Sequence, residues 1–189
     1  MFRANVFAVY DCGFRPRSAL EVSNSAQTRI DKILDIVGES KFGIHDISRT
    51  QCSGVPRLPR FNMPLELGIF LGAKRFGASE HKMKNCLVFD SDSHRYQRFI
   101  SDIAGQDIAS HANDPRRLIS EIRNWLSDTS GRRLPGGREI AKRFDSFHRF
   151  LPETCRKASL DLADLTFRDL CGLIEEWLEI VSPAAQLAD

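Results

Sequence analysis

One carboxylate interrupts an otherwise apolar stretch of this sequence. Glu66 is the only acid in the segment RFNMPLELGIFLGAKRFG, residues 60–77, and a leucine flanks it on each side. A Glu is rarely buried unless something pairs with its charge, so an acid at this position needs an explanation. In a protected site, a carboxylate can act as a nucleophile or stabilise positive charge on a sugar carbon during bond cleavage.

Three groups of polar residues are predicted to lie near this acid. The first follows a predicted strand at residues 5–10, the second closes a predicted strand at residues 42–47, and the third opens the helix that contains Glu66. The carboxyl ends of parallel strands and the N-termini of the following helices form one edge of a sheet, where ligands bind. We expect Glu66 in the first turn of its helix, where the helix dipole favours a negative charge. The candidate site residues are Tyr10, Asp11, Gly13, Arg15 and Arg17, then Asp46, Ser48 and Arg49, and finally Asn62, Met63 and Glu66.

Each of these residues also has a purely structural explanation. Glu66 could complement the helix dipole or pair with Arg49 or Arg60. The aspartates could end strands and cap turns, which is the commoner use of Asp in loops. The acidic run DSDS at residues 90–93 is interpreted as a solvated loop, because no matching set of metal ligands accompanies it. The convergence of the three polar groups on one edge favours a site.

The elements that would position these residues alternate along the chain. Short apolar runs are typical of buried strands, and apolar residues spaced three and four apart predict helices between them. This order predicts an α/β fold, a three-layer, doubly wound, flavodoxin-like parallel sheet of four to five strands. The predicted strands are 5–10, 42–47, 85–89 and 107–110, and the predicted helices are 25–38, 62–75, 95–104 and 115–126.

The pattern changes after Ser127. The run SDTSGRRLPGG has the composition of a linker, and only helices are predicted beyond it, near residues 138–150, 153–164 and 167–181. We therefore expect an α/β domain over residues 1–127 and a C-terminal helical extension over residues 128–189. The extension is either a small cap or an oligomerisation element, since its last helix is too apolar to lie free in water.

Composition bounds the class of protein. The chain has 189 residues, of which 42% are hydrophobic and 28% charged, as in ordinary globular proteins. A net charge of +2 does not favour a dedicated nucleic-acid binder, and no apolar run is long enough to span a membrane. Five scattered cysteines without a CxxC motif predict reduced thiols and a cytoplasmic location.

The order SKFGIHDIS, NMPLELGIFLGAK and NCLVFD resembles the nucleoside 2-deoxyribosyltransferase family and the related TIR domains, over about residues 5–126. The stretches YDCGFRPR, DISR and PRFNMPLELG are typical of bacterial proteins of this TIR-like type. In the transferases the Glu of the matching stretch is the catalytic nucleophile, and in TIR enzymes it supports cleavage of the nicotinamide–ribose bond of NAD. The resemblance implies that role for Glu66, an acidic substrate-binding position for Asp46, and an aromatic or polar position after the first strand for Tyr10.

The expected function is therefore cleavage or transfer of an N-glycosidic bond on a nucleoside, nucleotide or NAD, without a metal or an organic cofactor. Asp46 and Asn62 are suited to orient ribose hydroxyls, while Arg15, Arg17 and the amides near Gly13 are suited to hold a phosphate. Two alternatives stay open. The same pocket could belong to a non-catalytic nucleotide-binding signalling module, or the chain could be a self-assembling TIR-like scaffold.

Overall fold

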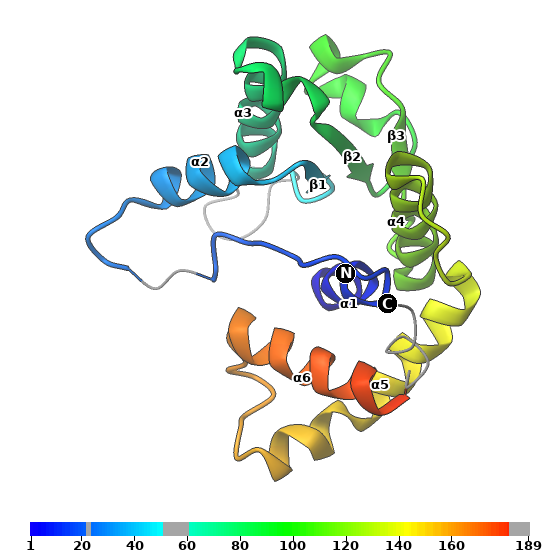
Figure 1. Cartoon of the computed structure of the whole chain (residues 1–189). Helices are drawn as coiled ribbons and strands as arrows, with labels where there is room; N and C mark the ends of the chain where they lie inside the picture. The colour runs from blue at the N-terminus through cyan, green and yellow to red at the C-terminus, as the bar shows by residue number, and fades with distance from the viewer. Residues whose placement is uncertain (22–23, 51–60, 182–189) are drawn as a thin grey trace. The chain divides into compact units, whose positions relative to one another are not determined.

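The computed structural model describes residues 1–21, 24–50 and 61–181. Its contacts divide the chain into two compact units. The sheet unit is Val22–Asp114, and the helical unit combines Met1–Glu21 with Pro115–Asp189. Figure 1 labels the helices and strands of both units.

The described residues of the sheet unit form three parallel strands in the order β1-β2-β3. They are β1 (Phe42–Asp46), β2 (Asn85–Asp90) and β3 (Ile108–Ser110). The register aligns Asp46 with Phe89, and Asp90 with Ser110. The carboxyl ends of all three strands therefore lie at one edge of the sheet.

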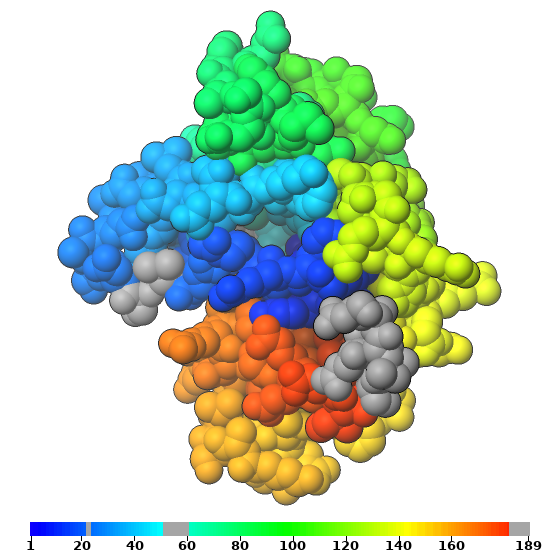
Figure 2. Space-filling model, viewed as in Figure 1, coloured from blue at the N-terminus to red at the C-terminus, as the bar shows by residue number. Residues whose placement is uncertain are grey.

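Two helices accompany β1, one before it and one after it. They are α2 (Arg29–Glu39) and α3 (Asn62–Phe76), and part of the outer surface of α2 is visible in Figure 2. Thr28 begins α2 with a reciprocal capping box to Asp31. Three single-turn 3₁₀ helices complete the unit: η1 (Ser79–Met83), η2 (Arg95–Arg98) and η3 (Ser101–Ile103).

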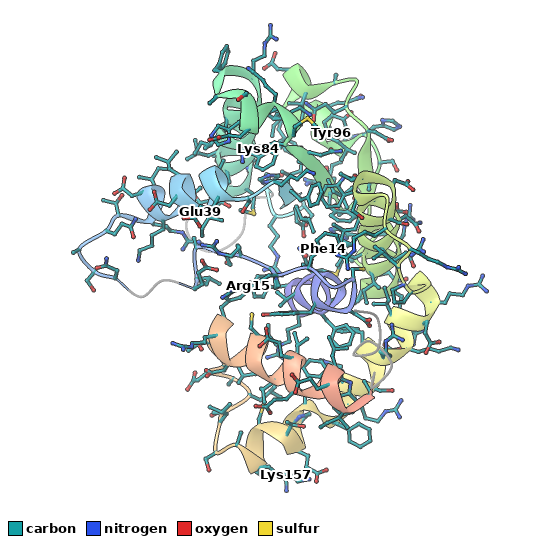
Figure 3. The ribbon with its side chains drawn as sticks, viewed as in Figure 1. Phe14, Arg15, Glu39, Lys84, Tyr96 and Lys157 are labelled. Atoms are coloured by element: carbon teal, nitrogen blue, oxygen red, sulfur yellow. The ribbon has the colours of Figure 1, made fainter. Side chains whose placement is uncertain are left out.

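The core of the sheet unit lies between α3 and one face of the sheet. Ile47, Leu67, Val88 and Tyr96 form a buried apolar cluster, and Tyr96 is labelled in Figure 3. Further along β1, a Cβ at Gly43 would approach a ring carbon of α3 to 2.9 Å. A glycine at that position therefore lets the helix pack closely against the strand.

The helical unit is built around α1 (Phe2–Asp11), which contacts the three other helices of the unit. These are α4 (Pro115–Ser130), α5 (Gly137–Lys157) and α6 (Phe167–Val181). The ring of Phe7 is fully buried and lies 5.6 Å from Phe144 and 5.3 Å from Phe147 between ring centroids. Within the described ranges, no helix combines the length and the apolar character needed to cross a lipid bilayer.

The structure confirms an α/β chain with a parallel sheet, but the prediction of a strand at residues 5–10 is wrong. This segment is part of α1, and Val6, Phe7, Ala8 and Val9 are all buried. A short apolar run does not distinguish a central strand from a helix that is buried on all sides, so its pattern was ambiguous. The part of the chain that the structure describes contains three strands where four to five were expected.

Three further boundaries differ from the prediction. The predicted helix at residues 95–104 consists of η2 and η3 instead. The predicted helix at 138–150 and the first part of that at 153–164 form the single helix α5, which continues through Pro152, while residues 158–164 lie beyond its end and are not helical. The units also divide after Glu21 and after Asp114, so α4 belongs with the helices and not with the sheet.

Candidate functional site

A histidine and an aspartate meet at the carboxyl edge of the sheet. His111 directly follows β3 and is fully buried, and its Nε2 lies 3.4 Å from Oδ1 of Asp46 at the end of β1. The backbone N–H of Asn113 donates to His111 Nδ1 at 3.0 Å. Nδ1 is thus an acceptor, which places the proton of the neutral ring on Nε2, facing the carboxylate.

The two oxygens of the Asp46 carboxylate have different surroundings. Oδ1 also accepts the backbone N–H of Ser48 at 3.0 Å, so two donors engage this oxygen. No residue in the described ranges donates to Oδ2. Because the side chain keeps 26% of its surface exposed, Oδ2 is available as a hydrogen-bond acceptor.

A buried ion pair lies beside this dyad. Asp90 ends β2 and is fully buried, and its Oδ1 accepts Nε–H of Arg95 at 2.7 Å and the N–H of Ser91 at 2.7 Å. The guanidinium also donates to the carbonyl oxygens of Ile47 and Ser48, each at 3.1 Å. Arg95 therefore ties the segment that follows β1 to the end of β2. The interpretation of residues 90–93 as a solvated loop is wrong for Asp90 and Ser91, which are buried.

The backbone around His111 is fixed by the same strand end. Its N–H donates to the carbonyl of Asp90 at 3.1 Å, and the N–H of Ala112 donates to the carbonyl of Ser91 at 3.1 Å. Ala112 and Asn113 adopt positive φ angles of 48° and 57°. Such a conformation is unfavourable for residues with a Cβ, and the hydrogen bonds of this turn offset its cost.

Glu66 lies on α3, beyond its first turn, which contains no acidic residue. The expectation of a first-turn position is therefore wrong. The side chain is half-buried, and burial raises the pKa of its carboxyl group, while the charge of Arg29 on α2 acts in the opposite direction. Within the described part of the chain, no residue forms a hydrogen bond or a salt bridge with the carboxylate.

The neighbours of Glu66 on α3 pack near the carboxyl end of β1. Met63 and Leu67, which precede and follow it on α3, pack in the cluster around Ile47, the residue directly after β1. His45 of β1 packs against Phe70, the next residue on the Glu66 face of the helix, with ring centroids 5.3 Å apart.

The two carboxylates face different sides of the sheet. Successive side chains of a strand alternate between faces, and His45 packs against α3, so Asp46 projects to the opposite face. Glu66 belongs to the helix on the His45 side. A ligand that contacts both carboxylates therefore has to lie across the end of β1.

The other predicted residues of this region have varied surroundings. Asn62 is exposed and is the first residue of α3, whose N-cap is Phe61 and has no side-chain cap. Met63 is an apolar packing residue, and Arg49 is exposed. Ser48 contributes its backbone N–H to Asp46 and its carbonyl to Arg95.

The N-terminal group of predicted site residues belongs to the helical unit, so it does not follow a strand. Asp11 forms a two-pronged ion pair with Arg143 of α5, at 2.7 and 2.8 Å. Burial raises the pKa of Tyr10, whose hydroxyl hydrogen bonds to Cys171 and Glu175 raise it further. The prediction that these two side chains follow a strand is wrong, because both residues belong to α1.

The remaining members of that group lie on the segment that leaves α1. Gly13 has a φ of +72°, a conformation that favours glycine, and its carbonyl accepts a hydrogen bond from Arg132 at 3.3 Å. Arg17 pairs with Glu21 at 2.6 Å. Arg15 is exposed and is labelled in Figure 3. Tyr10 and Asp11 end α1, so these residues follow a helix and not a strand.

Sequence reasoning missed three residues: Asp90, Arg95 and His111. Asp90 ends β2 and His111 follows β3, so the rule that selected Asp46 also applies to them. Arg95 carried no comparable signal, because its role depends on the path of the loop after β1. Among the described residues, no group of three His, Cys, Asp or Glu side chains is arranged to hold a metal ion.

The candidate site thus comprises Asp46, His111, Asp90, Arg95 and Glu66, all within the sheet unit. Comparisons of the chain with protein-family models, with curated proteins and with solved structures find no match.

Proposed function

We propose that the sheet unit binds a nucleoside, nucleotide or NAD across the carboxyl ends of its strands and cleaves or transfers the N-glycosidic bond. In this reaction the bond between the sugar carbon and the base breaks as positive charge develops on the sugar. Glu66 would supply the carboxylate that attacks or stabilises that carbon.

The observation that carries this proposal is the state of Glu66. Its carboxyl group is half-buried, burial raises its pKa, and no described residue pairs with it. A half-buried carboxylate without a partner lowers the unfolding free energy, because no ion pair offsets the loss of hydration. Functional carboxylates often have this property. A purely structural Glu on a helix would be expected to form an ion pair or to lie in the first turn.

The surroundings of Glu66 support the same reaction. The partly exposed side chain of Asp46 lies at the carboxyl end of the strand that precedes α3, where a ligand of a parallel sheet is expected to bind. A sugar placed across the end of β1 would have Asp46 toward one face and Glu66 toward the other. The order of strand 42–46, helix 62–76 and strand 85–90 also agrees with the resemblance to TIR-like and deoxyribosyltransferase-like proteins, and with a larger flavodoxin-like sheet.

The basic residues of the N-terminal segment have no part in this proposal. Arg15 and Arg17 were assigned to phosphate because they were expected to follow a strand. In their place, the phosphate of a nucleotide would rest near the exposed Arg49, which follows β1.

The test is base release by the full chain. Wild-type protein, Glu66→Gln and the control Glu179→Gln are incubated with NAD and a panel of nucleosides and nucleotides, and freed base is quantified by chromatography. Glu179 is exposed on α6, so Glu179→Gln removes the same charge from the helical unit. We expect release by the wild type and the control, and a loss of two or more orders of magnitude in Glu66→Gln with an unchanged melting temperature.

Two results would count against the proposal. Full activity in Glu66→Gln would remove Glu66 from the reaction. Binding of a nucleotide without release of base by the wild type would favour the alternative of a non-catalytic nucleotide-binding module.

A further inference from the structure

We propose that His111 is a positioning residue that presents one oxygen of Asp46, Oδ2, to two adjacent hydroxyl groups of a ribose. This inference rests on the proposed function only for the place of the ligand, across the end of β1. It restricts the expected substrates to ribosyl compounds and excludes 2′-deoxyribosyl compounds.

The first step is a one-way series of hydrogen bonds that ends on Asp46. The N–H of Asn113 donates to His111 Nδ1 at 3.0 Å, and His111 Nε2–H faces Asp46 Oδ1 at 3.4 Å. The ring is fully buried, so water does not compete for either nitrogen. The tautomer of His111 is therefore set by the backbone, and the ring acts as a donor toward the carboxylate.

The second step is the rigidity of the turn that holds the ring. The N–H groups of His111 and Ala112 are bonded to carbonyls of β2 and the residue after it, at 3.1 Å each. Ala112 keeps a positive φ angle that alanine usually avoids, and Asn113, a residue that tolerates this conformation, keeps one as well. A strained turn that is fixed on both sides keeps the imidazole in one place, as a preorganised site requires.

The third step concerns Oδ2 of Asp46, the oxygen that is left to accept a hydrogen bond from a ligand. Asp46 Oδ1 accepts from both His111 and the N–H of Ser48, while Oδ2 has no donor among the described residues. A carboxylate oxygen is an acceptor only, so the ligand group that fits it must be a donor. Its lone pairs match two neighbouring hydroxyls, and an Asp at a strand end is a common partner of ribose hydroxyls in open α/β sheets.

The test compares three probes that differ only in hydroxyl groups: adenosine 5′-monophosphate, its 2′-deoxy form and its 2′,3′-dideoxy form. Affinities are measured by calorimetry with the full chain. We expect the wild type to prefer the ribose form over the dideoxy form by at least about tenfold, the worth of a hydrogen bond to a charged acceptor. Asp46→Asn, which presents an amide in place of the carboxylate, should lose this preference.

Two variants of His111 separate positioning from simple packing. His111→Gln can still donate a hydrogen bond to Asp46, whereas His111→Phe fills the space without a donor. We expect His111→Gln to keep most of the preference for ribose and His111→Phe to lose it. If His111→Phe does not fold, the pair of Asp46→Asn and His111→Gln decides the question on its own.

A second readout needs no variant. In protein labelled with ¹⁵N-histidine, the resonance of His111 Nε2 should shift when adenosine 5′-monophosphate is added and should not shift with the dideoxy form. Equal affinity of the wild type for the three probes, no binding of any of them, or an unchanged preference in His111→Phe would overturn the inference. Base release from NAD without a preference for ribose would overturn this inference alone, while a preference for ribose without base release would overturn only the proposed reaction.

Discussion

Arg95 and Asp90 form a buried ion pair in which the guanidinium Nε donates to Oδ1 at 2.7 Å. The same guanidinium reaches the carbonyls of Ile47 and Ser48 and the hydroxyl of Thr50. One side chain after β2 therefore holds both the end of its own strand and the segment that leaves β1.

Replacing Arg95 with Met should destabilise the chain strongly, because Asp90 would keep a buried charge without a partner. Loss of one member of a buried pair costs about 3–5 kcal/mol of unfolding free energy. Arg98→Met, an exposed change on the same 3₁₀ turn, is the control and should cost less than about 0.5 kcal/mol. Unfolding in urea measures both. Equal, small effects of the two variants would show that the pair does not hold this edge.

Lys84 stabilises the end of α2. Its ammonium group is buried and donates to the carbonyls of Val37 at 2.5 Å and of Ser40, and it is labelled in Figure 3. Burial lowers the pKa of Lys84, yet these carbonyls provide the partners that a buried ammonium needs. Lys84→Met should lower the unfolding free energy by about 1–3 kcal/mol, since carbonyls at the helix end lose a donor. The exposed change Lys74→Met on α3 should have little effect, and a comparable loss in both variants would contradict this role.

The burial of His45 leads us to expect that the unfolding free energy depends on pH. The ring is buried against Phe70, its Nε2 has no hydrogen-bond partner among the described residues, and burial lowers its pKa to about 4. An unfolded chain binds a proton on this ring below about pH 6.5, while the folded chain does so only near pH 4. The contribution of His45 to stability is therefore complete above pH 6.5, falls between pH 6.5 and 4, and is constant below.

The size of this effect follows from the shift in pKa. At about 1.4 kcal/mol per unit, His45 should account for a loss of about 3 kcal/mol across that window. His45→Leu removes the titrating group and keeps an apolar side chain of similar size. Urea unfolding of both proteins from pH 4 to pH 8 should show a difference that grows as pH falls. Parallel curves would mean that His45 does not control this dependence.

The ion pair between Asp11 and Arg143 is expected to stabilise the helical unit. The side chain of Asp11 is only 5% exposed and that of Arg143 is 20% exposed, and Asp11 raises the pKa of the guanidinium through their hydrogen bonds. Asp11→Asn should cost about 2–3 kcal/mol, because a largely buried guanidinium loses its charged partner. Asp145→Asn, which breaks the exposed pair with Arg116, should cost less than about 1 kcal/mol. Thermal unfolding compares them, and the reverse order of effects would refute the interpretation.

The elements of the sheet unit could be predicted because each has a distinct local pattern. The runs FGIHD and NCLVFD, with turn residues on both sides, were predicted as strands, and the structure contains both. Asp46 could be placed at a strand end by the same reasoning. His111 also follows a predicted strand, but its pairing with Asp46 could not be predicted, because no local signal connects a residue after β3 with one at the end of β1.

The N-terminal segment could not be assigned from its own residues. The run NVFAVY is apolar on all sides whether it is a central strand or the middle of a buried helix, and its neighbours decide between them. Those neighbours are α4, α5 and α6, which follow more than a hundred residues later. Tyr10 and Asp11 were assigned to a strand end for this reason alone, and Glu66 lies just beyond the first turn because α3 begins at Asn62, with Phe61 as its N-cap.

The position of α1 in the helical unit has a consequence for synthesis. In chain order this helix precedes the sheet unit, whereas α4, α5 and α6 follow it, so α1 is synthesised well before the helices that it contacts. Until then, α1 lacks the three helices that cover its apolar side chains, and exposed apolar surface of this kind is a target for chaperones. Closing contacts across such long separations also slows folding. We therefore expect the sheet unit to fold first, with the helical unit completed only when the last helix has been translated.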